Sequence, residues 1–388
     1  MRGRWTKPSS YGRRSELGSE PGAPLLEVHE LSTAFRTPAG RVQAVDNVSL
    51  SLDRGRTLGI VGESGSGKSV LVRSLMGLLP SSIAERRGEV VFEGKKLSRL
   101  REGELRQYWG TEMAMVFQDP MTSLNPVRRV ERQITDSMRY HLDVSVAEAR
   151  ERAIALLTSV GIPEPGRRLR NYPHELSGGM RQRVTIAMAL ACGPKLLLAD
   201  EPTTALDVTV QAQILNLLAE QQQDRFMGMI LVTHDLGVVA GRTDEIAVMY
   251  AGQIVEQAPT DVLFANVRMP YTEALLKSIP KLEQPSHTRL QIIGGRPPDL
   301  INPPPGCRFA PRCPYAQPKC RTEAPPLVEA ETPGHRFRCW FPVGTEAGRD
   351  ALARNLAAHV PAADAAVAGD TRAAALVESA ASDGGGEV

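Results

Sequence analysis

The feature that most constrains this chain is a glycine-rich stretch at residues 62–69, which reads Gly-Glu-Ser-Gly-Ser-Gly-Lys-Ser. It follows a short apolar run at residues 57–61, which predicts a buried strand, and it precedes a helical pattern at residues 70–76. A strand, a glycine-rich turn, a lysine, a hydroxyl and a helix form the usual context of a phosphate-binding loop. Glycines let backbone N–H groups point at phosphate oxygens, and the helix N-terminus adds its positive dipole end.

Within this loop, Lys68 would place a charge between the β- and γ-phosphates, and the Ser69 hydroxyl would bind Mg²⁺. The residues that we expect to hold the nucleotide phosphates are Gly62, Ser64, Gly65, Ser66, Gly67, Lys68, Ser69 and Val70.

Composition sets limits on the partners of the chain. Its 388 residues include 46 basic and 44 acidic side chains, for a net charge of +2, so nothing demands nucleic acid or a membrane surface. No apolar run approaches the roughly 18–20 residues that span a bilayer, and residues 1–20 lack the apolar segment of a secretory signal. We therefore expect no nucleic-acid partner and a place in the cytosol or facing it.

The order of patterns along the chain predicts its organisation. Residues 1–24 are basic and expected to be disordered. Residues 25–280 predict an α/β domain that starts with an antiparallel sheet and contains an inserted helical subdomain at about residues 121–175. Residues 281–345 predict a small extension with four cysteines, and residues 346–388, rich in alanine and glycine, predict a disordered tail.

Polar residues follow three of the expected strands at their carboxyl ends. Gln118 follows residues 113–117, Asp200 and Glu201 follow residues 196–199, and His234 follows residues 230–233. Open α/β sheets bind ligands at this edge. Asp200 and Gln118 could complete a Mg²⁺ shell with Ser69, Glu201 could reach a water, and His234 could reach a γ-phosphate. A plain loop glutamine and a structural histidine are the alternatives for Gln118 and His234.

Two further positions are candidates for nucleotide contacts. Ser177 can cap a helix N-terminus whose Gly178 and Gly179 leave the backbone open to an anion, although an ordinary helix start has the same appearance. Phe35 lies upstream of the phosphate loop, where an aromatic ring could stack on a purine; an ordinary core phenylalanine is the alternative.

Taken together, these motifs resemble those of the ATP-binding-cassette (ABC) transporter ATPases. Residues 62–69 match the Walker A loop, Gln118 the Q-loop, residues 196–201 Walker B and His234 the switch histidine. Residues 176–180 match the signature sequence, with Met180 in its variable last place, and residues 205–207 match the D-loop with Asp207. Phe35 falls at the aromatic A-loop position. The resemblance covers about residues 25–280.

The resemblance implies a fold and a mechanism. The fold would be an α/β P-loop NTPase of the ABC type, with a mixed-sheet core, an antiparallel β subdomain, an inserted α-helical subdomain and a small Cys-rich C-terminal extension. Glu201 would act as general base with His234 and Gln118, and ATP and Mg²⁺ would be the cofactors. Ser177, Gly178 and Gly179 would complete the site of a second ATPase subunit rather than their own.

Other stretches are similar to the dipeptide/oligopeptide permease ATPases, notably residues 121–126, 203–211 and 269–276. This similarity implies peptide import at the cytoplasmic face of the membrane. The partners would be a second ABC ATPase subunit, two transmembrane permease subunits and an extracytoplasmic peptide-binding protein. Nickel, sugar and opine systems, and an ABC ATPase outside transport, remain alternatives.

The late cysteines Cys307, Cys313, Cys320 and Cys339 stand among prolines and glycines with few aliphatic residues. This segment therefore needs a covalent cross-link or a bound metal to fold. Disulfides do not suit a cytosolic setting. Four thiolates can bind zinc, but no tight Cys-x₂-Cys pair is present. The resemblance favours a [4Fe–4S] cluster, with Zn²⁺ as the alternative.

Overall fold

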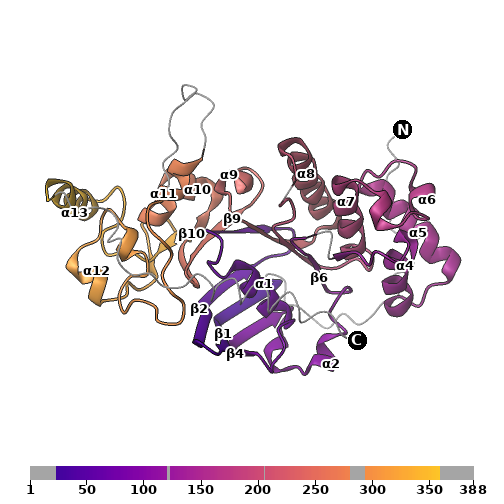
Figure 1. Cartoon of the computed structure of the whole chain (residues 1–388), viewed down its shortest axis with the longest axis horizontal. Coiled ribbons are helices and arrows are strands. Elements are labelled where there is room, and N and C mark those ends of the chain that lie inside the picture. The colour runs from indigo at the N-terminus through magenta and orange to yellow at the C-terminus, as the bar shows by residue number, and fades with distance from the viewer. Residues whose placement is uncertain (1–22, 120–122, 205, 280–292, 359–388) are drawn as a thin grey trace.

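The computed structural model describes residues 23–119, 123–204, 206–279 and 293–358. Residues 1–22 of the tail expected at 1–24, residues 359–388 of the tail expected at 346–388, and residues 281–292 at the start of the extension lie outside these ranges. Within them the chain builds two sheets with helices around them (Figure 1).

The smaller sheet is antiparallel and has the strand order β2-β1-β4-β5. Its strands are β1 (Leu26–Thr37), β2 (Gly40–Leu52), β4 (Ala84–Phe92) and β5 (Lys95–Lys96). The pairing of β1 with β2 confirms the antiparallel start expected from the sequence.

The larger sheet has the order β11-β12-β10-β9-β3-β8-β7-β6. Its central strands run parallel to one another: β9 (Glu245–Tyr250), β3 (Thr57–Val61), β8 (Gly228–Thr233), β7 (Leu196–Asp200) and β6 (Met113–Val116). Every residue of β3, β6, β7 and β8 is buried, which is why these strands read as unbroken apolar runs.

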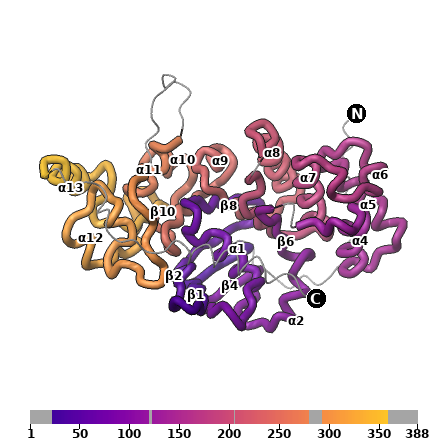
Figure 2. Tube along the Cα trace, viewed as in Figure 1, coloured from indigo at the N-terminus to yellow at the C-terminus, as the bar shows by residue number. Residues whose placement is uncertain are grey.

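The cassette helices lie around the sheets. They are α1 (Lys68–Met76), η1 (Leu97–Arg99), α2 (Glu102–Leu105), α4 (Val130–His141), α5 (Val146–Ser159), α6 (Pro165–Arg168), η2 (Pro173–Glu175), α7 (Gly178–Ala189), α8 (Val208–Arg225), α9 (Leu236–Val239), α10 (Thr260–Ala265) and α11 (Pro270–Ser278). Helices α4 to α7 gather at one end of the molecule, opposite the C-terminal extension (Figure 2).

The helical pattern at residues 130–159 is divided into α4 and α5. Helix α4 ends at His141, and the backbone of Asp143 just beyond it has a φ of 49°, in the left-handed region, which cannot continue the helix. Ser145 then starts α5 by accepting a hydrogen bond from the backbone N–H of Glu148 at 3.2 Å.

The extension continues the large sheet. After β10 (Gln253–Pro259), which is antiparallel to β9, the edge is formed by β12 (Arg336–Phe337) and β11 (Val328–Glu329). The short helices of the extension are η3 (Ala310–Arg312) and α12 (Pro318–Thr322). The extension is therefore packed on the cassette through backbone pairing as well as side chains.

The expectation of a disordered tail from residue 346 is wrong for its first part, because helix α13 covers Glu346–Ala357. Thr345 caps it by accepting a hydrogen bond from the Gly348 N–H at 3.1 Å, and its alanines have high helix propensity. The Asn355 side chain donates to the carbonyls of Pro314 and Ala316 at 2.8 and 3.0 Å, which fastens the helix to the cysteine-containing loop.

Among the residues that the structure describes, no helix is both long enough and apolar enough to cross a membrane.

Candidate active site

The glycine-rich loop of residues 62–69 joins β3 to α1, as the sequence predicts. Two of its glycines touch neighbouring backbone. A Cβ on Gly67, whose φ is 99°, would lie 2.1 Å from the Ala44 carbonyl oxygen, and one on Gly62 would lie 2.1 Å from the Met249 carbonyl oxygen. No side chain fits at either position, so the narrow turn that exposes backbone N–H groups requires glycine.

Lys68 lies inside this loop with 4% of its surface exposed. Its ammonium donates to the carbonyls of Gly62 at 3.0 Å and Glu63 at 3.1 Å, and lies 3.5 Å from Glu201 Oε1. The fixed positive charge at the head of α1 suits phosphate oxygens.

Glu201 is the point at which the strand-end residues meet. Its Oε2 lies 3.2 Å from His234 Nδ1 and 3.5 Å from Gln118 Nε2. Thr204, which the sequence analysis did not single out, donates its hydroxyl to the same oxygen at 3.1 Å. The backbone of Glu201 has a φ of 44°, a left-handed conformation that tends to occur where function holds it in place.

The electrostatics of this group keep Glu201 ionised. Burial raises the pKa of Glu201, but the hydrogen bond with His234 and the charge of Lys68 outweigh it, so its pKa lies below the ordinary value. The same hydrogen bond raises the pKa of His234. An ionised carboxylate beside the phosphate loop can accept a proton from water.

Asp200 and Ser69 fit a Mg²⁺ ion. Asp200 is fully buried, and its Oδ1 accepts a hydrogen bond from the Ser69 hydroxyl at 2.9 Å. Its Oδ2 is buried with no hydrogen-bond partner in the described structure. Burial raises the pKa of Asp200 to about 6 despite the Ser69 hydrogen bond. A buried carboxylate oxygen without a partner, next to a hydroxyl and the phosphate loop, is what a hard cation would satisfy.

The signature residues lie away from this cluster. Ser177 caps α7 by accepting from the Met180 N–H at 3.3 Å, and Ser177 and Gly178 are exposed. Asp207 caps α8 in the same way, with Val210 N–H at 2.9 Å, and is exposed. Within the described part of the chain, none of these three lines the pocket beside the phosphate loop.

That pocket is lined by both polar and apolar residues. Its lining consists of Ser64, Gly65, Gly67, Lys68, Ser69, Val70, Gln118 and Glu201, together with Val42, Ala44 and Leu300. Phe35, expected to stack on a purine, is not among them: it pairs with Val42 across the small sheet and is only 3% exposed. The structure therefore places Phe35 in the core and puts other apolar side chains at the pocket wall.

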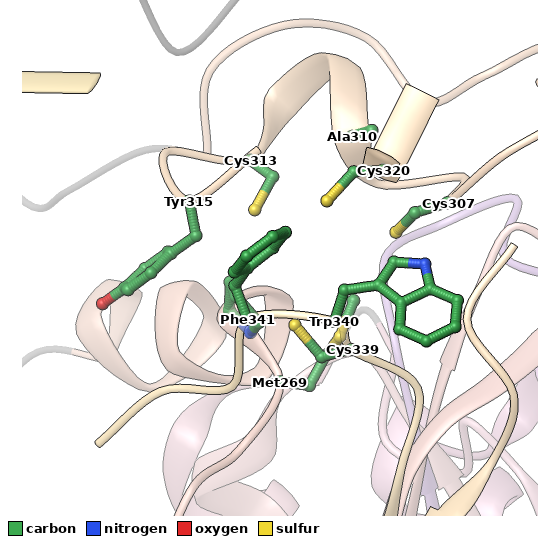
Figure 3. Close-up of a pocket in the computed structure, with 10 residues that line it drawn as sticks. Met269, Cys307, Ala310, Cys313, Tyr315, Cys320, Cys339, Trp340 and Phe341 are labelled. Atoms are coloured by element: carbon green, nitrogen blue, oxygen red, sulfur yellow. The ribbon is translucent and has the colours of Figure 1, made fainter. Parts of the chain in front are cut away.

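A second cavity brings together the four late cysteines. Cys307, Cys313, Cys320 and Cys339 all line it, and Figure 3 shows their sulfur atoms facing a shared space. All four are free thiols. The rest of the lining is largely apolar and consists of Met269, Pro270, Ala310, Tyr315, Trp340 and Phe341.

Burial in this cavity raises the pKa of all four thiols, that of Cys307 to about 11. Thiolates there would need a compensating positive charge. Across the described ranges, no group of three or more His, Cys, Asp or Glu side chains is arranged so that it could hold a metal ion.

Comparison with known proteins agrees with this geometry. Residues 45–204 match the family model described as "ABC transporter", and residues 255–320 match the one described as "Oligopeptide/dipeptide transporter, C-terminal region". The chain is 51% identical to the oligopeptide transport ATP-binding protein OppD of Bacillus subtilis, over 82% of this chain and 88% of that protein. It is 48% identical to the dipeptide transport ATP-binding protein DppD of Escherichia coli, over 84% of this chain and 99% of that protein.

Solved structures give the same fold. The dimeric post-hydrolysis structure of the ATP-binding cassette MJ0796 with ADP and Pi has a TM-score of 0.55 and 28% identity, and covers 61% of this chain and 98% of that one. Structure cbiO1 from Clostridium perfringens has a TM-score of 0.53 and 30% identity, and covers 62% and 91%.

The chain therefore belongs to the ABC transporter ATPases. Within them it belongs to the group of oligopeptide and dipeptide transport ATP-binding proteins.

If Glu201 is the proton acceptor, Glu201→Gln should slow ATP hydrolysis by at least ~10²-fold while ATP still binds, because the amide keeps the shape and loses the basicity. Steady-state phosphate release and nucleotide binding would be measured on the same assembled transporter. Glu93→Gln, a change at a carboxylate that pairs with Lys195 outside the pocket, is the matched control. Hydrolysis near the wild-type rate in Glu201→Gln would refute the assignment.

Proposed function

We propose that this chain hydrolyses ATP to power the import of dipeptides or oligopeptides across the cytoplasmic membrane. The single observation that carries the proposal is the similarity to peptide transport ATP-binding proteins over most of both chains, extending into the C-terminal region. Related importers of nickel, sugars or opines are the second candidate, since the ATP site itself does not select the cargo.

The proposal implies partners. Two permease subunits would provide the membrane passage, and an extracytoplasmic binding protein would deliver the peptide to them. The chain would sit peripherally on the cytoplasmic face of the membrane, with α4 to α7 directed to the permeases. A second ABC ATPase subunit, which we propose to be a different chain, would complete the pair; no nucleic acid is involved.

In the catalytic step, the residues around the phosphate loop would have separate roles. Loop N–H groups and Lys68 would bind the β- and γ-phosphates. Glu201 would take the proton of a water that attacks the γ-phosphorus, and ADP would leave. His234 and Gln118 would orient Glu201 and the water. Ser69, Asp200 and Gln118 would hold Mg²⁺, which supplies positive charge to the phosphate oxygens.

The cargo assignment can be tested by reconstituting the complete transporter with its binding protein in lipid vesicles. Peptide-loaded binding protein should stimulate ATP hydrolysis and drive labelled peptide into the vesicles, whereas a nickel- or sugar-loaded preparation should not. Uptake of nickel or a sugar with no response to peptides would overturn the peptide proposal and leave the ATPase intact.

We also propose that the signature of this chain acts on the partner's nucleotide. Two observations support this: Ser177 and Gly178 are exposed outside the chain's own pocket, and the related cassette MJ0796 is dimeric with ADP and Pi.

Ser177→Arg should leave nucleotide binding by the isolated chain unchanged and reduce turnover in the complex by about tenfold or more, because the bulky cation blocks the anion-facing helix start. Equilibrium binding and complex turnover would be compared with Ser177→Ala. Loss of binding in the isolated chain would mean that the signature acts within its own site.

For the cysteine cavity we propose a [4Fe–4S] cluster held by Cys307, Cys313, Cys320 and Cys339. Four free thiols around one largely apolar cavity support it, because such a cluster takes four thiolate ligands and compensates their charge. The Cys307 N–H donates to the Cys320 carbonyl at 2.8 Å, which joins the two segments that carry these ligands, and a side chain at Gly306 would clash with the same carbonyl. The cluster lies apart from Glu201, so its role would be structural or redox-sensing.

Protein purified without oxygen should be brown, absorb near about 400 nm and carry about four irons and four sulfides per chain. Cys307→Ser should lose iron and the visible band, while Cys192→Ser, which changes a buried cysteine outside the cavity, should keep both. A colourless wild-type protein with one zinc would overturn the cluster in favour of Zn²⁺.

A further inference from the structure

The nucleotide pocket has a wall that comes from the C-terminal extension. Leu300 lines the pocket together with Val42 and Ala44 of β2. In the sequence, Leu300 lies far from every motif of the site. Together with Val70, these three residues supply the apolar side chains of the lining, while the phosphate loop, Gln118 and Glu201 supply its polar groups. A nucleotide whose phosphates occupy the loop would therefore have Val42, Ala44 and Leu300 available to its base.

Backbone contacts hold Leu300 in this position. The N–H of Gln43 donates to the Leu300 carbonyl at 3.0 Å, so the segment lies along β2. The next N–H, that of Ile301, donates to Asp299 Oδ1 at 2.8 Å. The structure has two clusters of buried hydrophobic residues, and Leu300 packs against both of them. Hydrogen bonds and packing therefore both fix the position of Leu300 against β2.

The burial of Phe35 explains why this wall matters. An aromatic ring that is 3% exposed cannot offer its face to a purine without repacking the core. The apolar surface on offer to a base consists of Val42, Ala44 and Leu300. Removing such surface from water is favourable in proportion to its area, so a base that covers Leu300 gains affinity.

A single guanidinium ties this wall to the phosphate loop. Arg312 has a side chain that is 3% exposed, and it donates two hydrogen bonds to the Glu63 carboxylate, at 2.6 Å and 2.8 Å. Its Nε donates to the Gly294 carbonyl at 2.9 Å and its Nη2 also donates to the Ile293 carbonyl at 3.2 Å, at the start of the described segment that leads to Leu300, while its Nη1 also donates to the Tyr250 hydroxyl at 3.2 Å. A bidentate pair of this kind fixes orientation as well as distance.

We propose that the C-terminal extension is a working part of the nucleotide site: Leu300 contacts the base of the bound nucleotide, and Arg312 is a positioning residue for the phosphate loop. The proposal rests on ATP binding by the cassette and not on the identity of the transported cargo. Its two parts act on different ends of the nucleotide, so ligands with and without a base can separate them.

The test compares MgATP with Mg-tripolyphosphate, which lacks a base, in equilibrium binding to the full chain. Leu300→Ala should raise the Kd for ATP about 3- to 10-fold and leave that for tripolyphosphate unchanged. The matched control is Ile301→Ala, because Ile301 packs against the same core without lining the pocket; it should bind both ligands as the wild type does.

Arg312→Lys keeps the positive charge and loses the bidentate contact with Glu63. It should therefore weaken the binding of ATP and of tripolyphosphate by the same factor, about 3- to 10-fold. Its control is Arg308→Lys, since the Arg308 side chain donates to Asp46 of β2 and to the Ala251 carbonyl, and none of its contacts in the described structure is with residues 62–69. That variant should bind both ligands normally.

Several results would overturn the proposal. The role of Leu300 at the base would be refuted if Leu300→Ala bound ATP with wild-type affinity, or if it lost affinity for ATP and tripolyphosphate equally. The same loss of ATP affinity in Ile301→Ala would refute it as well. The positioning role of Arg312 would be refuted if Arg312→Lys bound both ligands with wild-type affinity, or if Arg308→Lys showed the same loss of affinity. A wild-type chain that binds neither ligand would instead contradict the ATP site itself.

Discussion

The parallel pairing of β3 with β8, and of β8 with β7, is the constraint on which the rest of the structure depends. The register sets Val61 beside Thr233 and Asp200 beside Val232, so three strands end at the same level. Glu201 and His234 directly follow β7 and β8, and Lys68 starts α1 after the phosphate loop that follows β3; Glu201 lies 3.5 Å from Lys68 and 3.2 Å from His234. A shift of one residue would turn each strand's side chains to the opposite face, which would separate Asp200 from Ser69 and Glu201 from Lys68.

The extension belongs to the same structural unit as the ATPase core. It adds β12 to the edge of the large sheet, pairs Arg308 with Asp46 on β2, and pairs Arg312 with Glu63 in the phosphate loop. His335 of the extension contacts the buried Glu256 of β10 at 2.8 Å. The Arg312 side chain is only 3% exposed, so loss of Glu63 would leave a buried charge without its partner. These contacts make the extension and the nucleotide pocket depend on each other's geometry.

This arrangement also connects the cysteine cavity to the pocket. Arg312 directly precedes Cys313, and η3, which carries Arg312, lies between two of the proposed ligands. Any change that reorders the cysteine loops would move the guanidinium that holds Glu63. The signature residues Ser177 and Gly178 are exposed and do not line this pocket.

The sequence by itself determined the phosphate loop, the strand-end residues Gln118, Asp200, Glu201 and His234, and the cysteine set. Each depends on local spacing, since a glycine-rich turn or a strand end places its side chains without reference to distant residues. The order and spacing of these motifs carried the family resemblance, which the similarity to known proteins confirms.

Only the tertiary structure decided which residues complete those local sites. It buried Phe35, made Leu300 a wall of the pocket and joined Arg312 to Glu63, across a separation of 249 residues. It also turned the start of the expected tail into α13, whose Asn355 is held by carbonyls of the cysteine loop. Contacts of this kind arise from packing between segments far apart in the chain, and no local pattern of residues records them.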